Sequence, residues 1–214
     1  MAKANENIED LMMMMPEQKG LIRTIVQQMN THLVFLDEDI TSPSTYRDVL
    51  HCLATCNEND TVNILLNSSG GRTDSAWAII EAMKGCRGEV VVTVIGAAYS
   101  AASMIACMAD QCFIADSAEM MLHTAHYGSI GTVPNVKSQT EFTTRQMNKL
   151  LDICYTGFLT AKEMDELKNG KEFWYSAEEA QIRMAKRYRY LESLSKPKKL
   201  KKEPKDVKQK MSEM

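Results

Sequence analysis

One serine in this sequence, at the end of an apolar stretch, occupies a position that suits a reactive hydroxyl. Ser100 follows the strand-like run EVVVTVI (89–95) and the segment GAAY (96–99), and a helix-like stretch of small residues comes after it. A hydroxyl at the start of a helix can point into a cleft, and the helix N-terminus favours negative charge on a neighbouring oxygen. An ordinary N-cap is the alternative role. Ser103, one turn further on, is expected to pack inside the helix.

A histidine occupies a similar position. His123 ends the apolar run EMMLH and precedes the polar segment TAHYGSIG. The rim of a sheet is a suitable place for a general base, because a side chain there can reach residues at neighbouring strand ends. A purely structural histidine is the alternative, and His126, three residues into the loop, is the weaker candidate for a base.

Two consecutive glycines, Gly70 and Gly71, follow the apolar run NILL and precede a helical pattern. Glycines permit positive φ angles and let backbone N–H groups face outward, so such a turn could cradle a phosphate or an oxyanion. The turn lacks the lysine of a phosphate-binding loop and the GxGxxG spacing, so nucleotide binding has little support. A plain strand-to-helix turn is the alternative.

These residues sit between alternating strand and helix patterns. Strands are expected at residues 32–36, 61–66, 89–95, 111–115 and 120–123. Helices are expected at residues 45–56, 72–84, 101–108, 141–159 and 177–188. The alternation predicts an α/β fold with a mainly parallel sheet.

Composition limits the class of protein. The 214 residues carry 28 acids and 25 bases, a net charge of −3, so the chain as a whole is not a basic nucleic-acid binder. Six cysteines show neither a CxxC pair nor a histidine at zinc-ligand spacing, which favours free buried thiols in a reducing compartment. We therefore expect no metal and no other cofactor. The first residues are acidic where a signal peptide is basic, so a cytoplasmic location is expected.

A membrane span is one alternative for the uncharged residues between Glu89 and Asp110. The first half of this stretch is β-branched, Gly96 interrupts it, and the second half consists of small residues. This pattern favours a buried strand, a turn and a buried helix over a membrane-spanning helix.

The two ends of the chain differ from its middle. Residues 1–20 are expected to form a flexible segment, residues 21–195 the folded domain, and residues 196–214 a disordered tail. The tail carries eight lysines against three acids, a net charge of +5. Such a composition is typical of a solvated segment rather than of a packed one.

Five segments resemble motifs of the Clp protease family, in the same order and at similar separations. HLVFLDEDI is similar to the family's first strand, and LLNSSGG is similar to its strand and NSPGG turn. GAAYSAASMIACMAD resembles the GxAAS segment, MMLH resembles MIH, and WYSAEEA resembles FxSAxEA. The resemblance covers about residues 21–191. It implies a Clp protease/crotonase-like fold of repeated ββα units, in which helix 141–159 projects as a handle.

The resemblance also implies roles for individual residues. Ser100 corresponds to the nucleophile and His123 to the base, and the amides of Gly71 and Ala101 correspond to the oxyanion hole. The third triad residue, an aspartate in the family, corresponds to Glu172. This chemistry is coherent, since a serine needs an adjacent base and the imidazole needs a carboxylate partner.

The chain departs from the family pattern at three places. Glu172 replaces an aspartate, and Asp165 and Glu166 are alternatives for the acid. Ser69 replaces the proline of NSPGG, and Thr-Ala rather than Gln-Pro follows the histidine. Such departures resemble those of Clp-type proteases carried by bacteriophages.

The implied function is that of a serine endopeptidase which cleaves unfolded polypeptides inside an oligomeric chamber. The resemblance implies a homo-oligomer of seven-membered rings, stacked in pairs, and an ATP-driven AAA+ unfoldase as partner, with no membrane or nucleic acid involved. The alternatives are a phage capsid-maturation protease, an inactive ring subunit and a crotonase-type enzyme acting on an acyl-coenzyme A.

Truncation after Ser195 should leave folding and peptidase activity intact, because the tail has few apolar residues with which to pack. We expect the free energy of unfolding to change by less than about 0.5 kcal/mol, the scale of a surface change. Thermal unfolding of the truncated and full chains measures this. A large stability loss would mean that the tail docks on the folded body.

Overall fold

The computed structural model describes residues 29–195, which fold around one six-stranded sheet. The strands are β1 (Thr31–Leu36), β2 (Thr61–Ser68), β3 (Glu89–Tyr99), β4 (Gln111–Ile114), β5 (Glu119–Leu122) and β6 (Phe173–Ser176). The helices are η1 (Pro43–Tyr46), α2 (Arg47–Thr55), α3 (Thr73–Gly85), α4 (Ala101–Cys107), α5 (Val133–Tyr155), α6 (Ala161–Lys168) and α7 (Ala177–Ser195). The expected segments 1–20 and 196–214 lie outside the described residues, so the domain limits stay predictions.

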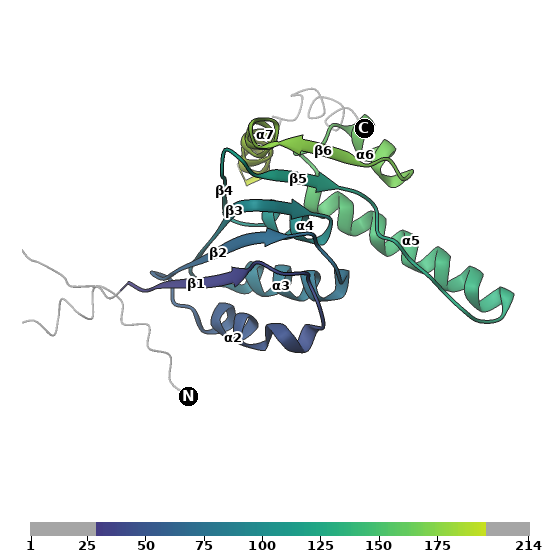
Figure 1. The fold of residues 1–214 in the computed structure, drawn as a ribbon, viewed down its shortest axis with the longest axis horizontal. Coiled ribbons are helices and arrows are strands. Elements are labelled where there is room, and N and C mark those ends of the chain that lie inside the picture. The colour runs from purple at the N-terminus through teal and green to yellow at the C-terminus, as the bar shows by residue number, and fades with distance from the viewer. Residues whose placement is uncertain (1–28, 196–214) are drawn as a thin grey trace, which may run out of the picture.

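The sheet has the order β1-β2-β3-β5-β6, and β4 pairs with β3 beside this path (Figure 1). Every pairing is parallel except that of β5 with β6, which is antiparallel. The core is built from alternate residues of the strands and from α3 and α4, with these side chains fully buried: Val62, Ile64, Leu66, Val92, Val94, Ile79, Ile80 and Ile105. The predicted α/β fold with a mainly parallel sheet is confirmed.

A bulge in β3 determines where the strand ends. Leu66 pairs with Val94 but Ser68 pairs with Ala98. Between these two pairs, β3 therefore contains two more residues than β2. The Asn67 side chain fills the gap, because its Oδ1 accepts a hydrogen bond from the Ala97 N–H at 2.9 Å. The bulge re-aims the strand, as such insertions do. The sequence-based end of this strand at residue 95 was therefore wrong, and β3 continues to Tyr99.

The long helix projects from the body, as expected, but with different bounds. Helix α5 runs over Val133–Tyr155 rather than over 141–159. Its N-terminus is set by Pro134, whose fixed φ suits the first helical turn, and its C-terminus by Gly157, which has a φ of +87°. In Figure 1 the loop after β5 runs out to the tip of α5, and the helix returns to the body.

Two short elements were missed by the sequence prediction. Helix α6 begins with a capping box, in which the Thr160 side chain accepts from the Glu163 N–H and the Glu163 carboxylate accepts from the Thr160 N–H. The Thr-x-x-Glu spacing was a readable signal for this helix. Strand β6 is only four residues long and forms the antiparallel edge of the sheet, where local sequence gives a weak signal.

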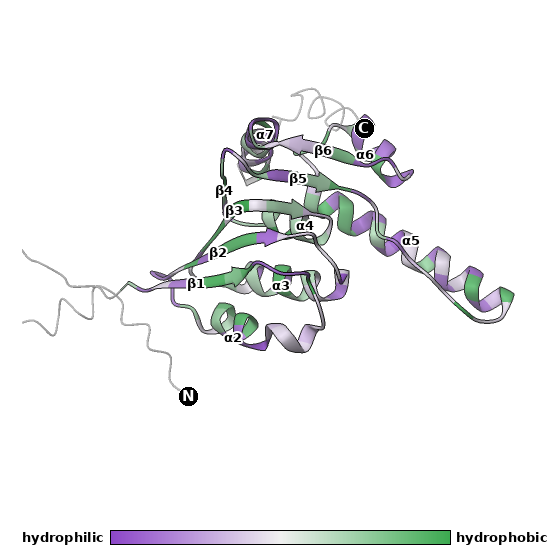
Figure 2. Cartoon of the chain, in the orientation of Figure 1, coloured by the Kyte–Doolittle hydropathy of each residue, from purple (hydrophilic) through white to green (hydrophobic). Residues whose placement is uncertain are grey.

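The uncharged stretch between Glu89 and Asp110 forms β3 and α4, as favoured above. Within residues 29–195 no helix is long and apolar enough to cross a membrane. All six cysteines are free thiols, but only Cys56, Cys107 and Cys154 are buried as expected, whereas Cys52, Cys86 and Cys112 are partly exposed. In Figure 2 the middle strands are mainly hydrophobic, whereas α5 mixes hydrophobic and hydrophilic residues along its length.

Replacement of Gly70 by alanine should destabilise the protein. Gly70 has a φ of +95°, and an added Cβ would lie 2.6 Å from the Tyr99 carbonyl oxygen. We expect a loss of about 1–3 kcal/mol in the free energy of unfolding, measured by urea denaturation. Gly85→Ala is the matched control, because a Cβ there meets nothing within 4 Å and alanine favours the helix. Equal stabilities for the two variants would contradict the packing argument.

Candidate active site

Ser100 lies in a strained turn between β3 and α4. It has a φ of +52° and is the one residue other than glycine with a positive φ among residues 29–195. Such a conformation persists only where the surroundings enforce it, and sharp strand-to-helix turns of this kind expose a serine hydroxyl. Its N–H donates to the Met121 carbonyl at 2.8 Å, and its carbonyl accepts from the Ser103 N–H at 3.1 Å. Ser100 thus occupies the N-cap position of α4, but its side chain makes no capping hydrogen bond, so its hydroxyl is free for another partner.

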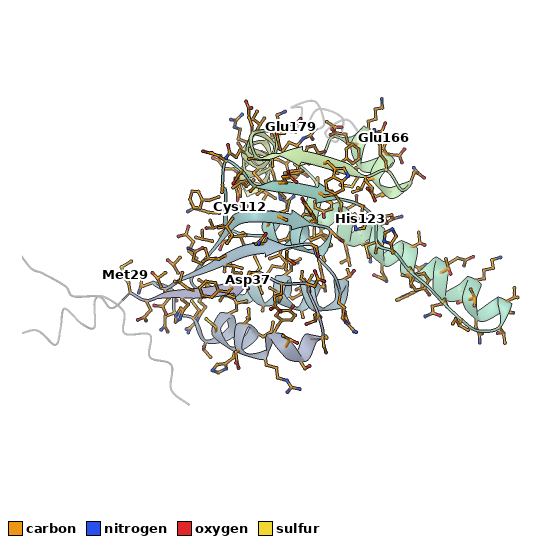
Figure 3. All side chains as sticks on the ribbon, viewed as in Figure 1. Met29, Asp37, Cys112, His123, Glu166 and Glu179 are labelled. Atoms are coloured by element: carbon orange, nitrogen blue, oxygen red, sulfur yellow. The ribbon has the colours of Figure 1, made fainter. Side chains whose placement is uncertain are left out.

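The parallel pairing of β3 and β5 brings His123 to this serine. Tyr99 pairs with Met121, so the residues that follow the two strands leave the sheet side by side. His123 Nε2 lies 2.7 Å from Ser100 Oγ, a hydrogen bond between residues 23 positions apart in the chain. Figure 3 shows His123 just beyond the carboxyl end of β5.

The antiparallel pairing of β5 and β6 brings Glu172 to the histidine. Leu122 pairs with Phe173, and continuing this register by one residue sets Glu172 opposite His123. Glu172 Oε1 lies 3.9 Å from His123 Nδ1, an ion-pair distance that is too long for a hydrogen bond, and the glutamate side chain is half exposed. A carboxylate on Nδ1 leaves Nε2 free to accept the serine proton.

The alternative acids lie elsewhere. Glu166 pairs with the Lys171 ammonium at 2.7 Å, and this pairing lowers the pKa of Glu166. Asp165 is exposed on α6. Of the three carboxylates considered, the structure brings Glu172 to the imidazole.

The glycine turn after β2 lies beside Ser100 and the start of α4. The Ile40 N–H donates to the Gly70 carbonyl at 2.7 Å, and the Arg72 N–H donates to the Ile40 carbonyl at 2.8 Å. In such a parallel bridge the N–H of Gly71 points away from Ile40, toward the side of β2 on which β3 lies. A Cβ on Gly70 would lie 3.0 Å from the Ala101 nitrogen, so the glycine turn and the start of α4 are in contact. This arrangement is suited to a pair of hydrogen-bond donors, the N–H groups of Gly71 and Ala101.

The environment of His123 favours the neutral imidazole. Burial lowers the pKa of His123, and the nearby His126 lowers it further, while Glu172 acts in the opposite direction. The rings of His123 and His126 are 5.1 Å apart in an edge-to-face arrangement. The sequence offered His126 only as a weak candidate for the base, whereas its position points to an electrostatic influence on His123.

A second cluster was not foreseen from the sequence. His32, Cys56 and Asp60 place one potential ligand atom each within 4.8 Å of one another, although no metal site was expected. The Asp60 carboxylate is already engaged, since it accepts from both Asn30 nitrogens at 2.9 Å and from the Asn57 N–H at 3.0 Å. These bonds lower the pKa of Asp60 to about 2 and account for the buried carboxylate as a cap of the loop before β2.

The reaction of Ser100 with a fluorophosphonate should depend on pH through His123. The base must be neutral, so the rate falls as the pH drops through the lowered pKa of His123, with a midpoint below about 6.5. His126→Asn removes a neighbour that disfavours the protonated form of His123, so the midpoint should rise. Glu172→Gln removes a neighbour that favours the protonated form, so the midpoint should fall. Shifts in the same direction for both variants would contradict this account.

Comparison with known proteins agrees with this geometry. The Clp protease family matches residues 17–182, which is more than half of the chain. ATP-dependent Clp protease proteolytic subunit 1 of Leifsonia xyli subsp. xyli is 26% identical over 123 residues, which cover 56% of this chain. The match spans 61% of that relative, less than two thirds of its length. The family match, the fold and the position of its motifs lead to one conclusion: the chain belongs to the Clp protease family.

Proposed function

We propose that this protein is a serine endopeptidase in which Ser100 is the nucleophile and His123 the general base. The observation that carries the proposal is the 2.7 Å hydrogen bond between Ser100 Oγ and His123 Nε2 at the strained end of β3. A structural serine would need neither the left-handed backbone nor a largely buried histidine partner. The hydrogen bond also favours this proposal over an inactive ring subunit and over a crotonase-type enzyme, which needs no such pair.

The reaction would proceed by acyl transfer. His123 Nε2 takes the hydroxyl proton as Ser100 Oγ attacks the peptide carbonyl, and the oxyanion receives hydrogen bonds from the Gly71 and Ala101 N–H groups. His123 then gives its proton to the leaving amine. A water molecule, activated in the same way, releases the acyl group and restores the free hydroxyl.

Glu172 would orient His123 and stabilise its charged form. With the carboxylate near Nδ1, the imidazole keeps its proton on that nitrogen and presents a lone pair at Nε2. The half-exposed position of Glu172 keeps its carboxylate in contact with solvent beside the imidazole.

The uncovered face of the sheet supports assembly into homo-oligomeric rings. Helices α3 and α4 lie on one face, and within the described residues the other face of the sheet carries apolar side chains that are 47–61% exposed, at Leu33, Phe35, Ile95 and Phe113. Parallel sheets are almost always covered on both faces. Copies of the same chain would cover this face, and the exposed apolar residues Val133 and Phe142 of α5 would join stacked rings.

The family likeness supports the remaining parts of the proposal. The name of the Leifsonia relative includes dependence on ATP, and such dependence would come here from a separate AAA+ unfoldase that feeds unfolded polypeptides into a chamber. The free, partly buried cysteines are compatible with a reducing cytoplasm.

Ser100→Ala should abolish hydrolysis of a small fluorogenic peptide while the oligomer survives. We expect a loss of at least about 10³-fold, because the nucleophile itself is removed. Fluorophosphonate labelling followed by peptide mapping should place the label on Ser100 in the wild type, and native mass spectrometry should give the same subunit number for both proteins. Near-normal turnover by the variant would refute the assignment. Ser103→Ala would then be assayed as the alternative nucleophile.

Glu172→Gln should keep the fold and lower peptide hydrolysis by about 10²-fold or more, less than the 10⁴-fold of a well-placed triad aspartate. Glu172→Asp restores the usual residue type with a shorter reach, so activity should be reduced but not lost. Asp165→Asn is the control and should retain wild-type activity. The opposite pattern, with Asp165→Asn inactive and both Glu172 variants normal, would move the acid to α6.

A further inference from the structure

A second serine contacts the nucleophile from inside the protein. Ser103 is fully buried in α4, and its Oγ donates to the Ser100 carbonyl at 2.7 Å. The same Oγ lies 2.7 Å from the hydroxyl of Tyr155, the last residue of α5, which is also fully buried. Neither hydroxyl is needed for the acyl-transfer steps, yet together they link α5 to the backbone of Ser100.

The direction of these two hydrogen bonds is fixed by chemistry. A serine hydroxyl has one proton, and a carbonyl oxygen can only accept, so the Ser103 proton points to Ser100. Tyr155 must therefore donate to Ser103. Burial raises the pKa of Tyr155 well above its usual value, so the phenol keeps the proton that it donates. The chain of donors runs from Tyr155 through Ser103 to the Ser100 carbonyl.

The end of this chain is the peptide group that joins Ser100 to Ala101. The Ser100 carbonyl and the Ala101 N–H belong to one rigid plane, so fixing the oxygen fixes the direction of the N–H on the other side. A hydrogen bond to the oxygen also polarises the peptide and strengthens its N–H as a donor. The positive φ of Ser100 makes the orientation of this plane costly to maintain without support.

Helices α4 and α5, which the bond between Ser103 and Tyr155 connects, are also joined through α7. The buried Arg187 of α7 donates from Nε to the Cys107 carbonyl at the end of α4, at 2.8 Å. Its Nη2 donates to the Ile153 carbonyl in the last turn of α5, at 3.2 Å. Helix α4 is thus connected to α5 near both of its own ends. The bond between Ser103 and Tyr155 makes the connection near the N-terminus of α4, and Arg187 makes it at the C-terminus.

We propose that Tyr155 and Ser103 are positioning residues that hold the Ser100–Ala101 peptide in its reactive orientation, so that the C-terminus of α5 sets the strength of an oxyanion donor. This inference rests on the proposed function of Ser100 as the nucleophile. It gives the projecting helix a direct polar connection to the reacting atoms.

The test compares Tyr155→Phe, Ser103→Ala and the double variant in the full-length protein. Each single variant should lower kcat for a small peptide, and the limiting rate of fluorophosphonate labelling at Ser100, by about tenfold, the scale of one lost hydrogen bond to a reacting group. KM and the midpoint of the acid limb should stay unchanged, because substrate binding and His123 are untouched. The double variant should be no slower than Ser103→Ala, because both changes break the same chain of bonds.

Tyr188→Phe is the matched control. It removes a buried tyrosine hydroxyl that lies outside the chain of hydrogen bonds from Tyr155 through Ser103 to Ser100. This variant should keep the wild-type kcat, and thermal unfolding shows whether stability changes alike in both tyrosine variants. Alanine is well tolerated in helices, so Ser103→Ala decides the question should Tyr155→Phe not fold.

Three results would overturn the inference: an unchanged kcat in both single variants, an equal loss in Tyr188→Phe, or fully additive losses in the double variant. If the wild type is labelled at Ser100 and the variants react normally, the positioning role alone fails. If the wild type is not labelled at Ser100, the proposed function fails and the inference fails with it.

Discussion

The hydrogen bond from the Ser100 N–H to the Met121 carbonyl ties the residue that follows β3 to β5, and the site depends on it. This bond sets the parallel register by which Ser100 and His123 leave their strands within hydrogen-bonding distance. The antiparallel register of β6 then adds Glu172 at the next position. Backbone pairings of the adjacent strand residues thus bring together three side chains that the sequence separates by 23 and 49 positions.

Burial and charge act against each other at His123. Burial and His126 lower its pKa, and Glu172 raises it, so the imidazole is neutral in the resting state and has a counter-charge when it takes a proton. A base needs both properties, since it must be unprotonated to begin the reaction and stable when protonated. Neither a deeply buried histidine without a carboxylate nor an exposed histidine beside one would satisfy both.

The sequence predicted the components of the site better than their connections. The apolar runs before Ser100 and His123 were strong signals, because buried strands of a parallel sheet are continuously hydrophobic. The choice of Glu172 over Asp165 and Glu166 depended on the resemblance, since only the pairing of β5 with β6 sets one carboxylate opposite the imidazole. The bond between Ser103 and Tyr155 had no local signal, because its partners are 52 positions apart and each looks like an ordinary helix residue.

The bulge at Asn67 and Ala97 divides β3 into a half that pairs with β4 and a half that pairs with β5. Side chains alternate along a strand, so the gain or loss of one residue at the bulge would turn Ala98, Tyr99 and Ser100 to the opposite face. The half of β3 that builds the core would keep its register with β2 and β4. A single-residue insertion or deletion at this point would therefore leave the core half of the sheet intact while it displaces Ser100 from its position. A lineage could keep the sheet and lose the hydrogen bond between Ser100 and His123 in one genetic step.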